Sequence, residues 1–259
     1  MKKIYEMFDL EGKTAIVTGA SKGIGYGIAE CFAQAGVNLA VVDREPLSGE
    51  GSKGELDTYG IKVLSIPTDV SKRSPVLEMV DKTIAEFGRI DILINNAAIV
   101  NRGPLIELQE KDWDKVIDTN LKGYFLCAQA VAKQMMKQGG GKIINIASIR
   151  SLLVAHDRGP YCSTKGGIVQ LTKAMALEWA CHKILVNAIA PGYFSTEMVT
   201  NYFEKMPEME QKVVEGTPLG RIGCPSDLHG VAIFLASDAS EFLTGEVIFV
   251  DGGWSIWKF

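Results

Sequence analysis

The stretch from Thr14 to Gly25, TAIVTGASKGIG, constrains the fold of this chain more than any other. It begins with an apolar, partly β-branched run that is typical of a buried strand. It continues through glycines in a G-x-x-x-G-x-G spacing and leads into a helical apolar stripe. Glycines allow a tight turn and the close approach of a pyrophosphate, and a helix N-terminus offers that group free N–H donors and a positive dipole end. The stretch therefore predicts a dinucleotide-binding βα unit.

Strand and helix patterns alternate through the rest of the sequence, which predicts βαβ units and a parallel sheet. Further strands are expected at residues 37–43, 61–70, 90–98, 142–148, 184–192 and 246–253. Helices are expected at residues 75–87, 113–136, 161–179, 193–216 and 227–235. Residues 44–60 contain Pro46 and several glycines, so this segment predicts a short or irregular helix. Without a repeat or a linker, residues 1–259 are expected to form one domain.

Composition excludes several classes of function. The net charge is −4 and there is no basic block, so neither a nucleic acid nor an anionic membrane surface is an expected partner. No apolar run is long enough for a membrane span or a signal peptide. The five scattered cysteines indicate reduced thiols in a cytoplasmic protein. The three histidines lack metal-ligand spacing, so no metal site is expected.

Asp43 ends the second expected strand, beside the glycine turn. A carboxylate at this position can accept hydrogen bonds from both hydroxyls of an adenosine ribose and repel a 2′-phosphate. The pattern therefore favours NAD. Lys22 within the turn and Arg44 after Asp43 leave NADP open, because either cation could pair with a 2′-phosphate.

Tyr161 and Lys165 form a Tyr-x-x-x-Lys pair on one face of a predicted helix. A tyrosine has a pKa of about 10 and needs a nearby positive charge to act as a base at neutral pH. Lys165 and a bound, positively charged nicotinamide can supply that charge. Ser148, at the end of a strand, can hold a substrate oxygen against the tyrosine. Asn120 lies inside a predicted helix, where its amide could bind a water that links Lys165 to solvent or could bridge backbone groups.

Together these residues resemble the short-chain dehydrogenase/reductase family. The turn TGASKGIG, the segment NNAA at 95–98 (with Ala98 where the family has glycine) and the segment PGYFST at 191–196 match the family pattern. Asn120, Ser148, Tyr161 and Lys165 match its catalytic tetrad. The resemblance implies a single-domain Rossmann-type doubly wound α/β fold, with about seven parallel strands and helices on both faces. It also implies that the cofactor contacts are Gly19, Ser21, Lys22, Gly23, Ile24, Gly25, Asp43, Arg44, Asp69, Val70, Asn96, Tyr161, Lys165, Pro191, Gly192, Phe194 and Thr196.

A narrower resemblance, to gluconate 5-dehydrogenases and related sugar-acid or polyol dehydrogenases, rests on the segment LEWACHKILVNAIAPGYFSTEM and the ending VDGGW. It implies a small-molecule substrate bound at the ends of the strands. The candidate substrate contacts are Arg102, Ser148, Arg150, His156, Tyr161 and Tyr193. Arginine suits a carboxylate because its planar fork donates two parallel hydrogen bonds.

The expected activity is hydride transfer between a nicotinamide cofactor, NAD or alternatively NADP, and a secondary alcohol or ketone. An NADP-dependent reductase of 3-ketoacyl thioesters is the rival enzyme, and a dinucleotide-sensing protein without catalysis is the rival from another class. The helices expected at 113–136 and 161–179 present more apolar surface than one sheet face can cover. The family resemblance places subunit contacts on these helices, so a homotetramer is expected.

Overall fold

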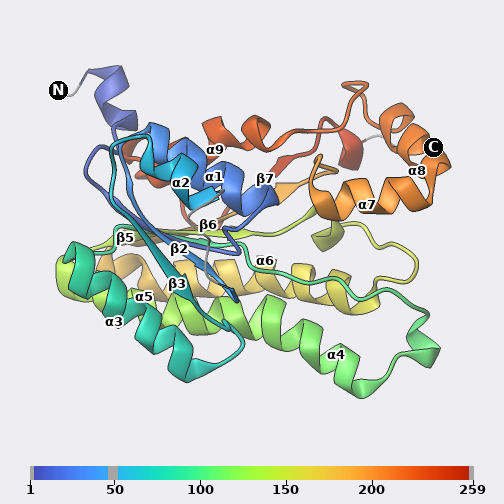
Figure 1. The fold of residues 1–259 in the computed structure, drawn as a ribbon, viewed down its shortest axis with the longest axis horizontal. Helices are drawn as coiled ribbons and strands as arrows, with labels where there is room; N and C mark the ends of the chain where they lie inside the picture. The colour runs from blue at the N-terminus through green and yellow to red at the C-terminus, as the bar shows by residue number, and fades with distance from the viewer. Residues whose placement is uncertain (1–2, 46–51, 257–259) are drawn as a thin grey trace.

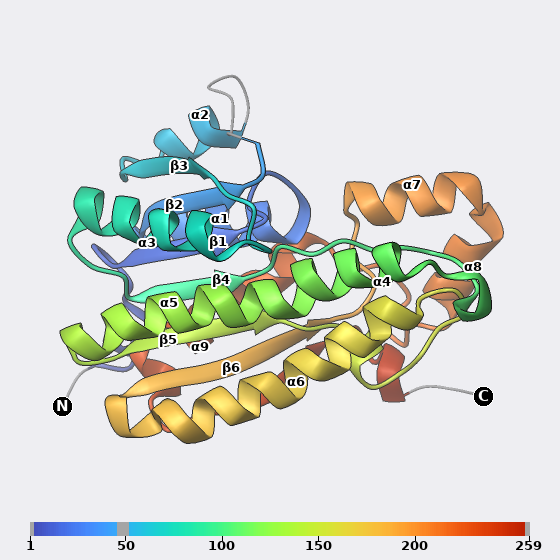
Figure 2. The same ribbon diagram turned by 90° about the horizontal axis from the view of Figure 1, so that it is seen from below.

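The computed structural model describes residues 3–45 and 52–256 of the chain. In that part of the chain, seven strands form one parallel sheet in the order β3-β2-β1-β4-β5-β6-β7 (Figures 1 and 2). The strands are β1 Thr14–Thr18, β2 Asn38–Asp43, β3 Val63–Pro67, β4 Ile92–Asn95, β5 Gly141–Ile146, β6 Ile184–Pro191 and β7 Val247–Val250. The strand order reverses direction between β1 and β4, which is the switch point where open α/β sheets bind ligands. The predicted doubly wound parallel sheet is confirmed.

Helices cover both faces of this sheet. The helices are α1 Gly23–Gln34, α2 Ser52–Asp57, α3 Arg73–Phe87, α4 Glu110–Ile117, α5 Gly123–Gln138, α6 Gly159–Trp179, α7 Glu197–Lys205, α8 Pro207–Glu215 and α9 His229–Ala236. In Figure 1, α1, α2 and α9 lie above the sheet, and α3, α5 and α6 lie below it. Helices α7 and α8 lie apart from these layers at the right of the view, on the same side as the start of α4.

The central strand β1 shows why both faces are covered. All five of its residues are buried. Ala15 and Val17 belong to the apolar cluster that contains Ile28 and Phe32 of α1, whereas Ile16 belongs to the opposite cluster. Side chains along a strand point alternately to the two faces, so a strand that is apolar at every position needs helices on both sides.

The structure of the segment after β2 agrees with what its composition predicts. The only regular element within the described part of residues 44–60 is α2, which has six residues. The expectation of a short helix is therefore confirmed, although Pro46 lies outside the described residues.

The helix expected at 113–136 is not regular. Helix α4 passes into a π-helical turn at Asp118–Lys122 before α5 begins. Such turns accommodate an additional residue and occur often at functional sites. The side chain of Asn120, at the centre of the turn, is fully buried and bonds to a distant part of the chain. Apolar periodicity contains no information about this long-range contact. For that reason it predicted an uninterrupted helix.

Candidate active site

The glycine turn joins β1 to α1 and is held against β4. Gly19 has a φ of +64°, and a Cβ atom there would lie 2.8 Å from the Cα of Ala97. A Cβ atom on Gly25 would collide with the carbonyl oxygen of Gly19. The Asn96 amide donates hydrogen bonds to the carbonyls of Thr18 and Gly19, at 3.0 and 2.9 Å. Only glycine fits these two positions, so the N-terminus of α1 is brought to the edge of the cavity beside the turn.

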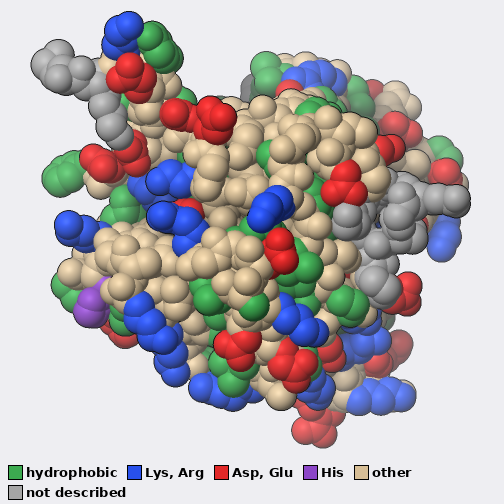
Figure 3. All heavy atoms as spheres, turned by 60° about the vertical axis from the view of Figure 1, so that its left-hand side comes forward, with side chains coloured by type: hydrophobic (Ala, Val, Ile, Leu, Met, Phe, Trp, Pro, Cys, Tyr) green, Lys and Arg blue, Asp and Glu red, His purple; other side chains and the backbone are tan. Residues whose placement is uncertain are grey.

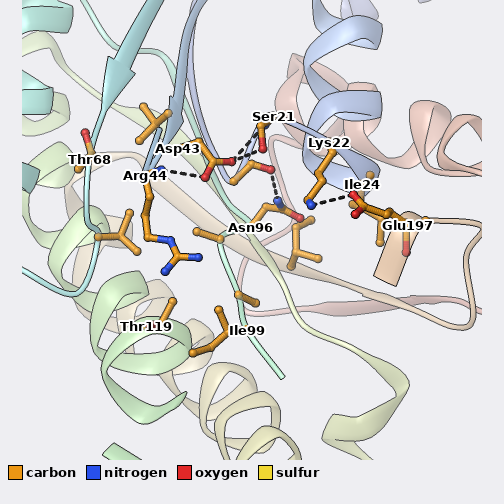
Figure 4. Close-up of a pocket in the computed structure, with 18 of the residues that line it drawn as sticks. Ser21, Lys22, Ile24, Asp43, Arg44, Thr68, Asn96, Ile99, Thr119 and Glu197 are labelled. Carbon is orange, nitrogen blue, oxygen red and sulfur yellow. Dashed lines mark hydrogen bonds and ion pairs between the residues drawn. The ribbon is translucent and has the colours of Figure 1, made fainter. Parts of the chain in front are cut away.

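A cavity of about 270 Å³ lies at the switch point, beyond the carboxyl ends of the strands (Figure 4). Thirteen of the predicted cofactor contacts line it, namely Gly19, Ser21, Lys22, Gly23, Ile24, Asp43, Arg44, Asp69, Val70, Asn96, Tyr161, Lys165 and Thr196. Thr68, Thr119 and Glu197 line it as well and were not predicted. The glycine turn and the Tyr161–Lys165 pair therefore face the same cavity.

Asp43 and Arg44 point in different directions within this cavity. The Asp43 carboxylate accepts hydrogen bonds from the Ser21 hydroxyl at 2.5 Å and from the backbone N–H of Arg44 at 2.8 Å. Figure 4 shows Asp43 turned toward Ser21, whereas the Arg44 guanidinium extends into the cavity. The Lys22 ammonium forms an exposed ion pair with Glu197 at 2.7 Å. Lys22 and Arg44 are the two cations that could bind a 2′-phosphate beside Asp43. Of these, Lys22 is already paired with a residue of α7.

Four predicted cofactor contacts do not line the cavity. Gly25 packs against the Gly19 carbonyl within the turn, and Pro191 is buried at the end of β6. Gly192 packs against Asp251, where a Cβ atom would approach the Asp251 Cα to 2.8 Å. Phe194 is 3% exposed and belongs to the apolar core around α1 and α9. These residues shape the wall from which Thr196 reaches the cavity.

Tyr161 lies in the first turn of α6, opposite Ser148, which follows β5 by two residues. Burial raises the pKa of the Tyr161 phenol, and this is the largest influence on it. A hydrogen bond with the Ser148 side chain and the guanidinium charges of Arg158 and Arg150 act in the opposite direction. The pKa of Tyr161 in the protein alone is therefore above its usual value, and the charges that lower it come from Arg158 and Arg150.

Lys165 is almost completely buried, with 2% exposure. Its ammonium donates a hydrogen bond to the carbonyl of Ile146 at 2.6 Å and lies 3.5 Å from the Tyr124 hydroxyl. The same nitrogen is 5.6 Å from the centre of the Tyr161 ring. Burial lowers the pKa of Lys165 to about 7. The predicted proximity of Lys165 and Tyr161 is therefore present.

Asn120 bridges backbone groups, which is the second of the two roles that its sequence position left open. Its side-chain oxygen accepts a hydrogen bond from the Ile99 N–H at 2.8 Å, and its amide donates to the Ile99 carbonyl at 2.8 Å. The amide also lies 3.3 Å from the Thr164 hydroxyl on α6. Asn120 thus ties the segment after β4 to the helix that carries Tyr161 and Lys165.

Comparison with known proteins agrees with this geometry. The sequence profile described as Enoyl-(Acyl carrier protein) reductase matches residues 19–255. The chain belongs to the short-chain dehydrogenase/reductase family. It is 43% identical to the 2-dehydro-3-deoxy-D-gluconate 5-dehydrogenase of Escherichia coli over 256 residues, which covers 97% of this chain and 98% of the relative. It is 39% identical to a 3-oxoacyl-acyl-carrier-protein reductase of Chlamydia muridarum over 245 residues, or 94% and 98% of the two chains.

A solved structure supplies a further comparison. The gluconate 5-dehydrogenase of Burkholderia cenocepacia, crystallised with NADP and tartrate, superposes with a TM-score of 0.91 and 37% identity. The superposition covers 99% of this chain and 100% of that protein. The likeness extends over the whole sheet and both helical layers.

In this short-chain dehydrogenase/reductase, the other candidate substrate residues lie on different segments from Tyr161. The Arg150 guanidinium donates hydrogen bonds to the Tyr193 hydroxyl at 2.6 Å and to the Val154 carbonyl at 3.0 Å. Arg102 follows β4, and its guanidinium carbon lies 4.0 Å from the centre of the Tyr202 ring on α7. His156 is exposed on the loop before α6. The structure therefore brings Arg150 together with Tyr193, and Arg102 together with α7.

Sequence reasoning about this family member missed Arg158 and Tyr202. The guanidinium carbon of Arg158 lies 5.1 Å from the same Tyr202 ring that Arg102 contacts. The position of Arg158, three residues before Tyr161, is a signal that could have drawn attention to it. The position of Tyr202 gives no such signal, because α7 reaches the other two residues only in the folded chain.

Within residues 3–45 and 52–256, no group of three or more His, Cys, Asp or Glu side chains is arranged to hold a metal ion. None of the helices in the same ranges combines the length and the apolar character needed to cross a membrane. On the face seen in Figure 3, lysine and arginine side chains are interspersed with aspartate and glutamate, without a continuous basic surface.

Proposed function

We propose that this chain is an NAD(P)-dependent dehydrogenase of a sugar acid, which interconverts a secondary alcohol and its ketone. One observation carries the proposal: the Tyr161–Lys165 pair and the glycine turn line the same cavity. A further support is that the relatives named above include enzymes of gluconate and of 2-dehydro-3-deoxygluconate.

The residues of the cavity fit a nicotinamide dinucleotide. The glycine turn and the N-terminus of α1 suit a pyrophosphate, and Asp43 suits the hydroxyls of an adenosine ribose. Asp69 and Val70, which follow β3, line the same cavity as Arg44, and the charge of Arg44 acts on the Asp69 carboxylate. Lys165 and Tyr161 line the side toward β5 and α6 and would hold the nicotinamide end. When bound, the cofactor supplies the hydride acceptor or donor.

The proton is handled by the chain itself. In the oxidative direction, the Ser148 hydroxyl and the Tyr161 phenolate bind the substrate hydroxyl, and Tyr161 accepts its proton. A tyrosine whose pKa is raised by burial is a poor base, so positive charge near the phenol must offset that burial. Lys165 in its charged form, Arg158 and Arg150 provide such charge. Asn120 positions the segment that brings α6 and the loop after β4 together.

Within this function we infer that NAD is preferred. The support is that the Asp43 carboxylate is fixed beside the turn, while Lys22 is paired with Glu197. The Arg44 guanidinium in the cavity is the feature that favours NADP. Three of the similar solved structures hold NADP, so the effect of Arg44 must be tested against that of Asp43.

A reductase of 3-ketoacyl thioesters is the second candidate, because a relative of that class matches nearly as well. An acidic acyl carrier protein would need a basic docking surface, and the net charge of −4 argues against one. The intact tetrad argues against a dinucleotide sensor without catalysis.

The test is a cofactor absorbance assay with gluconate, 2-dehydro-3-deoxygluconate or its oxidised form, a neutral polyol and a 3-ketoacyl thioester. Turnover of a sugar acid in preference to the others is the expected result. Preference for the thioester would move the assignment to the second candidate.

We also infer that the chain forms a homotetramer in the cytoplasm. An apolar groove between α4–α5 and α6 is lined by Ile117, Leu121, Phe125, Gly167, Leu171 and Ala174, together with Lys122 and Gln170. A second copy of the same helices suits this groove, because a two-fold axis pairs like surfaces. The five free cysteines suit a reducing compartment.

A further inference from the structure

Arg102 and Arg158 contact one aromatic ring from two separate segments. Their guanidinium carbons lie 4.0 and 5.1 Å from the centre of the Tyr202 ring. The two segments are tied together by a backbone hydrogen bond from the Gly103 N–H to the Asp157 carbonyl, at 3.1 Å. Asp157 has a φ of +58°, in the left-handed region, immediately before Arg158. The arrangement therefore depends on the loop after β4, the start of α6 and helix α7 at once.

The two guanidinium charges are close enough to oppose each other. Burial and the charge of Arg158 both lower the pKa of Arg102. Within the described residues, the ion pairs of the structure involve other side chains, and neither arginine has a carboxylate partner. The contacts with the Tyr202 ring offset part of this repulsion through the negative ring face. An anion bound between the two guanidinium groups would offset it further.

The positive charge of Arg158 lies next to the expected reaction centre. Arg158 is the residue before the first turn of α6, and its charge acts on the Tyr161 phenol. By contrast, two N–H groups of Arg150 are already used by Tyr193 and the Val154 carbonyl. Arg150 is therefore suited to hold Tyr193 in place, and Arg102 and Arg158 are suited to bind a group of the substrate.

We propose that Arg102 and Arg158, held by the ring of Tyr202, form the receptor for the substrate carboxylate, and that Arg150 is a positioning residue for Tyr193. This proposal rests on the proposed function, because it names the two arginines that recognise the acid group of a sugar acid. Because Tyr202 lies on α7, occupation of the receptor also holds this helix over the substrate.

The experiment compares gluconate and 2-dehydro-3-deoxygluconate with the neutral polyol glucitol. For Arg158→Gln, the KM for the acids should rise about tenfold or more, and the KM for glucitol should change much less. Tyr202→Leu should raise the KM for the acids in the same selective way, and Tyr202→Phe, which keeps the ring, should restore it. Arg73→Gln, an exposed arginine on α3 that donates to Gln129, is the matched control.

A binding measurement separates this proposal from the proposed function. Calorimetry of gluconate with the enzyme–NADH complex should show about tenfold weaker binding in Arg158→Gln than in wild type. Loss of binding in this variant without any turnover of sugar acids by wild type would preserve the receptor and reject the proposed substrate. Equal effects of Arg158→Gln on acids and glucitol, unchanged acid binding, or no binding of gluconate by wild type would each reject the receptor.

Discussion

The Asp43 carboxylate is fixed to Ser21 by two hydrogen bonds, one from the hydroxyl at 2.5 Å and one from the backbone N–H at 3.2 Å. Ser21 belongs to the glycine turn, whereas Asp43 ends β2. A negative charge is therefore held beside the N-terminus of α1, at the edge of the cavity where a ribose would bind. This relationship makes the choice of cofactor testable with a single side chain.

We predict that wild type has a higher kcat/KM with NAD than with NADP. Removal of the carboxylate in Asp43→Ala should lower this preference by about tenfold or more, because the repulsion of a 2′-phosphate is lost. The measurement is kcat/KM with each cofactor. Asp81→Ala, at an exposed position on α3, is the control. Equal use of the two cofactors by wild type would show that Arg44 outweighs Asp43.

A second prediction concerns proton transfer. Tyr161→Phe should lower kcat by about 10²- to 10⁴-fold, because only the oxygen that accepts the proton is removed. The Kd of the cofactor, measured by fluorescence, should change by no more than a few-fold, since the ring remains in place. Tyr59→Phe removes the hydroxyl of a tyrosine near α2 and serves as the control. Wild-type turnover by Tyr161→Phe would contradict the assigned role.

Local patterns were sufficient to predict most of the sheet, because every parallel strand is an apolar run between polar turns. The strand end at Asp43 and the short helix before β3 follow from such patterns. The π turn does not, because it depends on hydrogen bonds between Asn120 and Ile99, which lie 21 positions apart in sequence. Apolar spacing along 113–136 carries no information about that contact.

The candidate site was predictable to the extent that its residues belong to a short motif. Tyr161 and Lys165 lie together because residues four apart share a helix face. Phe194 belongs to such a motif too, but its side chain packs into the apolar core. Arg158 and Tyr202 meet only because the chain folds α7 back across the start of α6. No local pattern could have paired them.

The burial of Lys165 leads to a prediction about stability. Its pKa is lowered to about 7 in the folded enzyme, against about 10.4 for an unfolded lysine. Between these values the unfolded chain binds more protons, so the free energy of unfolding of wild type rises with pH across this window. Lys165→Met removes the buried ammonium, and the Ile146 carbonyl keeps the Tyr124 hydroxyl as a donor.

The inactive Lys165→Met variant should therefore be more stable than wild type by about 1–3 kcal/mol near pH 7. This advantage should shrink as the pH approaches about 10. Thermal melts of the two proteins at several pH values provide the measurement, and Lys137→Met, at an exposed position on α5, is the control. A lower melting temperature for Lys165→Met near neutral pH would contradict this account.

A fourth prediction concerns assembly. Light scattering should give the mass of a tetramer for wild type at micromolar concentration. Phe125→Asp should produce smaller species, because a charge is placed in the apolar groove between the long helices. Leu77→Asp changes an exposed leucine on α3, outside the groove, and should leave the mass unaltered. A monomeric wild type would reject the inferred tetramer.

The π turn at Asp118–Lys122 also limits how the gene can be edited. One residue advances an α-helix by about 100°, so the wide turn sets the angular offset between α4 and α5. Deleting one codon within the turn would allow a continuous ladder of i to i−4 hydrogen bonds, yet it would rotate α4 together with its buried Val116. Asn120 would then point away from Ile99. Insertions and deletions between β4 and β5 are therefore expected to be tolerated only in the loops. The length of this helical segment determines where Asn120 lies relative to the active site.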